Sequence, residues 1–175
     1  MIALAWLGEV RKRRSHTRAK ILIVDDHEVV RQGVRAMILR SRPEWEISGE
    51  AATGVEALQA IRSLSPDVVV LDITMPDMSG LEVALQVAKL HLRAALLIFT
   101  MHESPRLVGE IRDVGAQGFV NKSSAGRDLI AAIEALLAGG TFFRQGVADA
   151  GPEPGGKPNP GLSFRRQLRL RLRQA

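Results

Sequence analysis

The chain has 175 residues, which gives room for one ordinary domain with its ends but not comfortably for two. Hydrophobic residues make up 46% and charged residues 25% of the sequence, a balance typical of a soluble globular protein. There is no cysteine, which excludes disulfides and thiolate chemistry and is consistent with a cytoplasmic protein.

The formal net charge of +5 is carried by the two ends of the chain. Residues 1–19 hold five basic side chains against one acid, and residues 151–175 hold six against one. The 131 residues between them hold 13 bases and 17 acids, so this central part is acidic. The basic surplus therefore does not indicate that the central part binds nucleic acid.

Residues 1–19 are predicted to form a basic, disordered extension. Its first segment, Met1–Leu7, is apolar but too short to span a membrane, and the positive charges follow it instead of preceding it. We therefore expect neither a signal peptide nor a membrane anchor. A start codon placed upstream of a natural beginning near Thr17 and a genuine extension are both left open.

Through residues 20–143, five short apolar runs alternate with segments of helical periodicity. The runs predict strands at Ile21–Val24, Trp45–Gly49, Val68–Leu71, Leu96–Phe99 and Gly118–Val120. This alternation predicts an α/β fold, a doubly wound five-stranded parallel sheet with helices on both faces. Periodicity alone does not choose among the doubly wound folds of this size.

The predicted helices have clear start and stop signals. Thr53 with Glu56 and Ser79 with Glu82 have the spacing of capping boxes. A third helix is predicted to begin where Ser104 caps a first-turn proline, and the last helix is predicted to stop at Gly139-Gly140.

Polar residues follow four of the predicted strands at their carboxyl ends, where ligands collect in an open α/β sheet. Asp25 and Asp26 follow the first strand, Asp72 the third, Thr100 the fourth and Lys122 the fifth. Each of them alone is explained by a turn, a cap or an exposed position. Together they fit phosphoryl chemistry, because a carboxylate can attack a phosphoryl group while a lysine and Mg²⁺ neutralise its charge.

Three segments resemble the receiver domain of bacterial response regulators, namely residues 21–35, 66–81 and 115–122. The Asp25-Asp26-His27 start and the Gly139–Phe143 end most resemble the NarL/FixJ (LuxR-type) branch. The resemblance covers residues 20–143 and implies a flavodoxin-like, CheY-like receiver fold.

The resemblance also implies the roles of the site residues. Asp72 would accept a phosphoryl group from a sensor histidine kinase, and Lys122 would pair with that group. Magnesium (Mg²⁺) would be held by Asp26, Asp72 and the backbone carbonyl of Thr74, and Asp25 would help through water. The chain would then be a two-component response regulator controlling transcription or a partner, with no enzymatic activity beyond self-phosphorylation and autodephosphorylation.

Thr100 and Phe119 would form the switch pair, with Thr100 drawn toward the phosphoryl group and Phe119 turning inward behind it. The family often has tyrosine at the Phe119 position. A homodimer would use the face made by the helix after Ser104, the strand around Phe119 and the helix from Ala125. Asn121 stands where the branch usually has an apolar residue, and we expect it to weaken the fifth strand mildly. No catalytic role is expected of the histidines.

Residues 144–175 are predicted to be a linker and basic tail. Gly151–Gly161 is rich in proline and glycine and cannot form a core. Leu162–Arg165 resembles the opening of the DNA-binding helix-turn-helix domain of this branch, but Gln167–Arg173 alternates with period two. We interpret the tail as a truncated or frameshifted remnant of that domain, with a genuine basic tail as the alternative. Sequence-specific DNA binding is expected of full-length relatives and not of this chain.

Other classes of protein fit less well. A phosphohydrolase resembling haloacid dehalogenases carries Asp-x-Asp, and Asp72-Ile73-Thr74 lacks the second acid. A flavodoxin-type electron carrier needs a Ser/Thr/Gly phosphate loop after the first strand, where Asp25-Asp26 would repel phosphate. A stand-alone receiver that acts by protein–protein contact, without DNA, remains the alternative within the favoured class.

Overall fold

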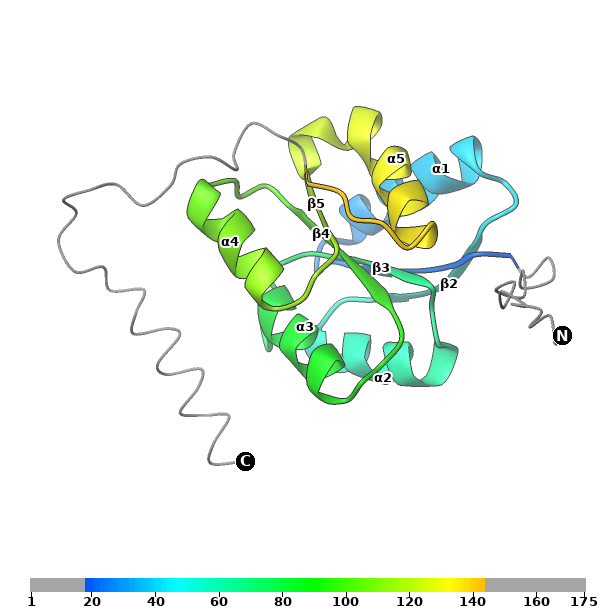
Figure 1. The fold of residues 1–175 in the computed structure, drawn as a ribbon. Coiled ribbons are helices and arrows are strands. Elements are labelled where there is room, and N and C mark those ends of the chain that lie inside the picture. Colours follow the sequence, from blue (N-terminus) through cyan, green and yellow to red (C-terminus); the bar gives the residue numbers. More distant parts are fainter. Residues whose placement is uncertain (1–17, 144–175) are drawn as a thin grey trace, which may run out of the picture.

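The computed structural model describes residues 18–143, which form five strands, five α-helices and one 3-10 helix (Figure 1). In chain order these are β1 (Lys20–Val24), α1 (Glu28–Ser41), β2 (Glu46–Ala51), α2 (Gly54–Leu64), β3 (Val68–Leu71), α3 (Gly80–Lys89), β4 (Ala95–Thr100), α4 (Pro105–Asp113), β5 (Gly118–Asn121), η1 (Lys122–Ser124) and α5 (Ala125–Leu137).

The strands form a single parallel sheet in the order β2-β1-β3-β4-β5. The predicted α/β fold with a five-stranded parallel sheet is therefore confirmed. The order reverses at β1, so the chain lays β2 on one side of β1 and then β3, β4 and β5 on the other. In such a sheet a crevice opens at the carboxyl ends of the strands next to the reversal.

Helices cover both faces of the sheet, with α1 and α5 on one face and α2, α3 and α4 on the other (Figure 1). Side chains of β1 alternate between the two cores, because Ile21 and Ile23 pack with α1 and α5 while Leu22 and Val24 pack with the other helices. This double burial explains why the sequences of β1 and β3 are continuous apolar runs.

The predicted helix starts are formed by the side chains expected. Ser79 and Glu82 make a complete capping box, and the Ser104 hydroxyl accepts from the backbone N–H of Leu107. The box predicted at Thr53 is only half formed. Thr53 accepts from the N–H of Glu56, but the Glu56 carboxylate accepts from the N–H of Ala52 and not from that of Thr53.

The predicted extension at residues 1–19 and tail at residues 144–175 lie, except for residues 18 and 19, outside the described residues. The same holds for the linker Gly151–Gly161 and the helix-turn-helix resemblance at Leu162–Arg165. The receiver boundaries at residues 20 and 143 stay predictions. Within residues 18–143, no helix combines the length and the apolar character needed to cross a membrane.

Candidate functional site

The carboxyl ends of four adjacent strands bring a group of buried polar side chains together. Four polar or charged residues are buried within residues 18–143, and three of them are Asp25, Asp72 and Thr100 at this edge. Backbone hydrogen bonds join the strand ends, since the Asp72 N–H donates to Val24 and the Asp25 N–H to Ala51. Burial of carboxylates is costly unless they are paired, so this edge is a site candidate and not an ordinary turn region.

Lys122 joins the two buried aspartates. Its Nζ atom lies 2.6 Å from Oδ2 of Asp25 and 3.1 Å from Oδ2 of Asp72, and only 12% of its side chain is exposed. The residue begins η1, directly after β5, so the end of the fifth strand carries the ammonium to the ends of the first and third. The sequence predicted these three residues at one edge, and the structure brings them into contact.

Burial raises the pKa of Asp72 above the ordinary value for an aspartate. Lys122 opposes this through its charge and its hydrogen bond, while the neighbouring carboxylate of Asp25 adds to the increase. The pKa stays raised in spite of Lys122 because the effect of burial outweighs that of the ammonium. A further cation beside Asp72 would favour its ionised form.

The clustered carboxylates show where a cation fits. Oδ2 of Asp25 is buried and lies 2.6 Å from the Lys122 ammonium, with which it forms an ion pair. A buried carboxylate oxygen of this kind beside further carboxylates is the donor set that hard divalent cations prefer. Asp25 and Asp72 thus fit a magnesium site.

The other two predicted metal ligands are placed differently. The Asp26 side chain is 31% exposed, and its Oδ1 atom lies 2.7 Å from Nδ1 of His27. Ligand atoms of Asp25, Asp26 and His27 all lie within 4.8 Å of one another. Thr74 is exposed in the β3–α3 loop, two residues after Asp72, and its carbonyl stays a predicted ligand. The sequence reasoning gave His27 no role, although its place next to two aspartates after a strand was a signal for this contact.

The predicted switch residues lie on β4 and β5. Thr100 is buried at the end of β4, where its hydroxyl accepts a long hydrogen bond of 3.4 Å from the N–H of His102. Phe119 is buried in the core that includes Val108 and Ile111 of α4. Phe119 pairs with Ile98 of the neighbouring strand β4, and Ile98 precedes Thr100 by two residues.

Asn121 stabilises the turn that carries Lys122. Its Oδ1 atom accepts from the N–H of Ser123 at 2.9 Å and from the Ser123 hydroxyl at 2.7 Å. Its amide donates to the carboxylate of Glu103 at 2.8 Å, and it contacts the carbonyl of Met101 at 3.4 Å. β5 extends through Asn121, which also caps η1 and joins two loops of the site. That Asn121 mildly weakens the strand stays a prediction.

Gly80 at the start of α3 and Asp77 in the β3–α3 loop have structural roles that the sequence did not reveal. A Cβ atom at Gly80 would lie 2.1 Å from the carbonyl oxygen of Asp72, so only glycine lets α3 begin beside this residue. The Asp77 carboxylate accepts from the N–H groups of Gly54 and Val55, and these bonds lower its pKa. The loop after Asp72 is thereby attached to the start of α2.

Comparison with known proteins identifies related sequences and folds. The family model of the response regulator receiver domain matches residues 21–134. A transcriptional regulator of Pseudomonas aeruginosa is 40% identical over 129 residues, which are 74% of this chain and 61% of that protein. The transcriptional regulatory protein UhpA of Escherichia coli is 32% identical over 154 residues, which are 88% of this chain and 76% of UhpA.

Solved structures agree with these sequence matches. A two-component response regulator of the LuxR family from Aurantimonas sp. SI85-9A1 is 40% identical, with a TM-score of 0.70 over 74% of this chain and 91% of that one. The signal receiver domain of NarL from Mycobacterium tuberculosis is 32% identical, with a TM-score of 0.66 over 70% and 98% of the two chains. The chain spans less than two thirds of the length of the Pseudomonas aeruginosa relative.

Proposed function

The chain belongs to the response regulator receiver domain family, and on that premise we propose that Asp72 accepts a phosphoryl group from a sensor histidine kinase. The observation that carries the proposal is the bridge from Lys122 to the buried carboxylates of Asp25 and Asp72. Members of this family are not enzymes in the usual sense, so the chemistry of this chain is the gain and loss of its own phosphoryl group.

In the transfer, a carboxylate oxygen of Asp72 attacks phosphorus, the bond from phosphorus to the donor nitrogen of a phosphohistidine breaks, and an acyl phosphate forms. The raised pKa makes this carboxylate a more basic nucleophile than an exposed aspartate. Lys122 already lies 3.1 Å from Asp72, and its ammonium pairs with a phosphoryl oxygen after transfer. Attack of water on the acyl phosphate releases inorganic phosphate and restores the carboxylate.

Magnesium, when bound, neutralises charge on the phosphoryl oxygens and on the clustered carboxylates. Asp26, Asp72 and the backbone carbonyl of Thr74 would hold it, and Asp25 would help through a water molecule. The ammonium of Lys122 would stay beside Asp25 and Asp72. Asp26→Asn removes one of the carboxylate charges, so we expect it to weaken Mg²⁺ binding.

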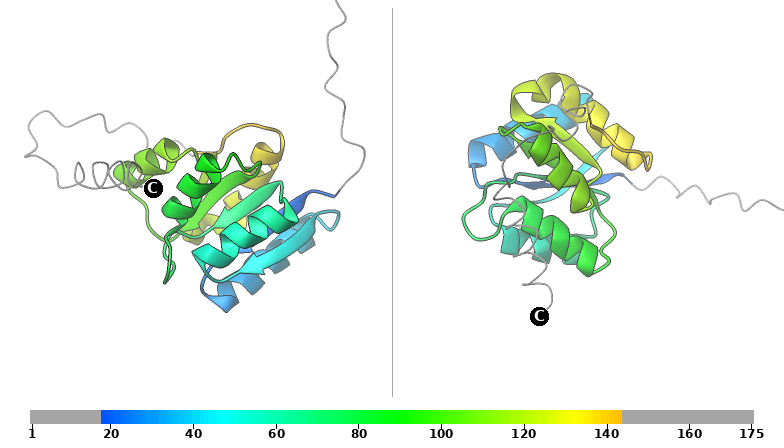
Figure 2. Two further views of the ribbon diagram at one scale, coloured as in Figure 1. Left: turned by 90° about the horizontal axis from the view of Figure 1, so that it is seen from below. Right: turned by 60° about the vertical axis from the view of Figure 1, so that its left-hand side comes forward.

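The signal is read on the side of the molecule formed by α4, β5 and α5 (Figure 2). The Thr100 hydroxyl is held by a single long hydrogen bond and is free to turn toward a phosphoryl group on Asp72. The Phe119 side chain fills the space that Thr100 leaves. Phe119 lies on the neighbouring strand opposite Ile98, two residues before Thr100. A homodimer, and through full-length relatives a DNA-binding output, uses this side, which runs from Ser104 through Phe119 to the helix from Ala125.

The test uses acetyl phosphate with Mg²⁺ as the phosphoryl donor and intact mass spectrometry as the readout. We expect the natural chain to gain one phosphoryl group and Asp72→Asn to gain none. Lys122→Gln serves as a second variant, which we expect to lose most of the adduct while keeping its fold by circular dichroism. The same adduct on Asp72→Asn as on the natural chain would overturn the assignment.

A further inference from the structure

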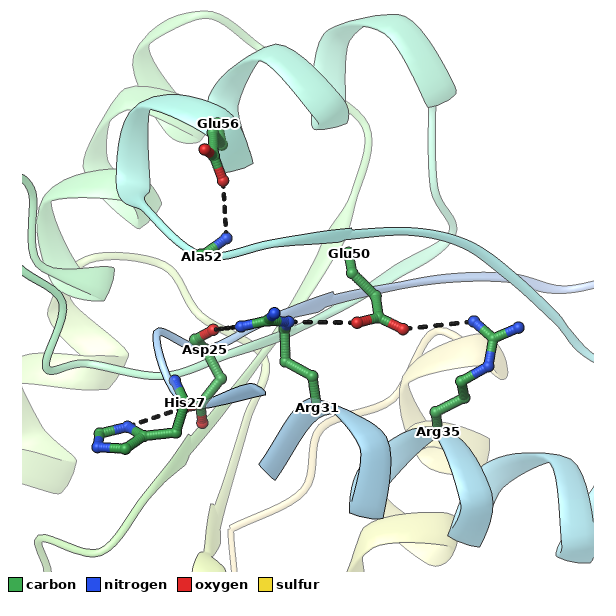
Figure 3. A network of polar contacts seen from close by, with 7 residues as sticks. All are labelled: Asp25, His27, Arg31, Arg35, Glu50, Ala52 and Glu56. Carbon is green, nitrogen blue, oxygen red and sulfur yellow. Dashed lines mark hydrogen bonds and ion pairs between the residues drawn. The ribbon is translucent and has the colours of Figure 1, made fainter. Parts of the chain in front are cut away.

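The loop between β1 and α1 is attached to the fold by an ionic network with Glu50 (Figure 3). Glu50 lies on β2, and Asp72 follows β3 on the other side of β1. Arg31 of α1 donates through Nη1 to the backbone carbonyl of Asp25 at 2.8 Å and through Nε to the Glu50 carboxylate at 3.2 Å. Arg35, one turn further along α1, donates to the other oxygen of Glu50 at 3.3 Å. Only Arg31 of the two arginines therefore reaches the loop.

Arg31 binds the peptide group from which both aspartates extend. The carbonyl that it binds belongs to the peptide linking Asp25 to Asp26. The orientation of this peptide therefore sets the direction in which both carboxylates point. The side chain of Arg31 is 16% exposed and that of Glu50 is 25% exposed, whereas Arg35 is 46% exposed. A sheltered bond of a charged donor to a carbonyl is stronger and more rigid than an exposed ion pair.

The remaining polar atoms of Asp25 have partners as well. Its N–H donates to the carbonyl of Ala51 at 3.1 Å, and its Oδ1 accepts from the N–H of His27 at 2.9 Å. With the Arg31 bond, three atoms of Asp25 are held and Oδ2 is left to face Lys122. The fold thus orients one carboxylate oxygen toward the site before any ligand arrives.

We propose that Arg31 is a positioning residue for metal binding, which acts by holding the Asp25–Asp26 peptide in the orientation that a divalent cation requires. The inference rests on the proposed magnesium site. Three neighbouring carboxylates repel one another and push this loop outward, and the bond from Arg31 opposes that movement. Binding to a loop held in advance costs less ordering entropy than binding to a loose one.

The sign of the effect separates positioning from plain electrostatics. Arg31 is a positive charge next to a cation site, so Coulomb's law alone predicts that its removal strengthens Mg²⁺ binding. Glu50 neutralises much of that charge through its ion pair. Positioning predicts the opposite result, namely weaker binding after removal of Arg31.

The experiment titrates MgCl₂ into the full chain by calorimetry, with the melting temperature of the metal-free protein as the measure of structural damage. We expect Arg31→Gln to weaken Mg²⁺ binding by at least about tenfold, the usual minimum for loss of a partner that orients a metal ligand. Arg35→Gln is the matched control, because it removes the same charge and a bond to the same Glu50 but no contact with Asp25. We expect it to change the affinity by less than about twofold.

A second readout is the rate of phosphorylation by acetyl phosphate as a function of Mg²⁺ concentration. In Arg31→Gln the half-saturating concentration rises while the rate at saturation is regained, which general structural damage would not produce. If Arg31→Gln unfolds, Arg31→Lys takes its place, because lysine keeps the charge but has no planar fork to serve Asp25 and Glu50 together. We expect the same loss of affinity there.

Each outcome decides. Unchanged or tighter Mg²⁺ binding in the folded Arg31 variant overturns the positioning role and leaves the magnesium site standing. An equal loss in Arg35→Gln also overturns it, since the network would then act through Glu50 and not through the carbonyl of Asp25. If the natural chain itself binds no Mg²⁺, the proposed metal site fails, and this inference fails with it.

Discussion

The β1–α1 loop and the β4–α4 loop border the same site but are held in different ways. In the first, Asp25 is anchored by bonds from its N–H, its carbonyl and one carboxylate oxygen, at 3.1, 2.8 and 2.9 Å. In the second, residues 101–104 are all exposed, and the hydrogen bonds to Thr100 and to the carbonyl of Met101 are both 3.4 Å long. Among residues 18–143, the one short hydrogen bond that attaches this loop to β5 is that from the Asn121 amide to Glu103.

This difference matches two different tasks in the proposed function. A side chain that binds a metal has to be in place before the metal binds, whereas a switch element has to move after phosphorylation. A loop with few buried contacts opens at a small cost in free energy, so the β4–α4 loop is the part in which a new bond to Thr100 has the largest effect. The comparison yields four predictions on stability and motion.

The largest expected effect comes from removing the charge that both aspartates share. Lys122→Met leaves Asp25 and Asp72 as buried carboxylates without a cation, and loss of one partner from a buried pair costs about 3–5 kcal/mol. We expect the free energy of unfolding at neutral pH to fall by about 3 kcal/mol or more. Urea unfolding measures it, and saturating Mg²⁺ should restore part of the loss. A variant as stable as the natural chain would show that the two carboxylates are not compensated by Lys122.

The next effect tests the rigid side of the site at Gly80. A methyl group there would lie 2.1 Å from the carbonyl oxygen of Asp72, so the β3–α3 loop has to shift. We expect Gly80→Ala to cost about 1–3 kcal/mol, the usual range for overpacking. Gly33→Ala in α1 is the control, because a Cβ atom meets nothing within 4 Å there. Equal thermal stability of the two variants would contradict the close approach.

A smaller effect of opposite sign is expected from Asp72→Asn without metal. The folded pKa of Asp72 is raised, so its contribution to stability is greatest below the unfolded value near 3.8 and is lost as pH rises through the folded value. At neutral pH the ionised group destabilises the fold, and asparagine removes that cost. Melting temperatures at several pH values measure it. The variant should melt higher than the natural chain at pH 7, and the gap should narrow as pH falls toward 4. Added Mg²⁺ should stabilise the natural chain more than the variant.

The sequence predicted most of the fold and the main members of the site. The strands β1, β3, β4 and β5 lie within one residue of their predicted ends, because strands buried on both faces have continuous apolar sequences. β2 is displaced by one or two residues, since an edge strand with mixed exposure has no such run. Asp25, Asp72, Thr100 and Lys122 were found because parallel strands all end at the same edge.

The residues that the sequence did not reveal act through the backbone. Arg31 binds a carbonyl in a loop six residues before it, and Gly80 is required by the close approach of a carbonyl oxygen. Asp77 caps a helix 22 residues earlier in the chain, at Val55. Such contacts depend on how loops turn back over the sheet edge, and no periodicity in the sequence records this.

The smallest effect on stability, and the sharpest test of the comparison, is expected from Asn121→Val. Valine suits a strand, so β5 should persist. The hydrogen bond from the Asn121 amide to Glu103 is lost, and so is the acceptor that caps the N–H of Ser123. Hydrogen bonds at exposed positions contribute little, so we expect a loss of about 0.5 kcal/mol in the free energy of unfolding. Amide hydrogen exchange of residues 101–104 should nevertheless become faster, because this bond is the short attachment of the loop to β5. Exchange in the β1–α1 loop should stay unchanged, since Asp25 is held by contacts that do not involve Asn121. Equal acceleration in both loops would show that the two sides of the site are coupled and that their different attachments do not separate binding from switching.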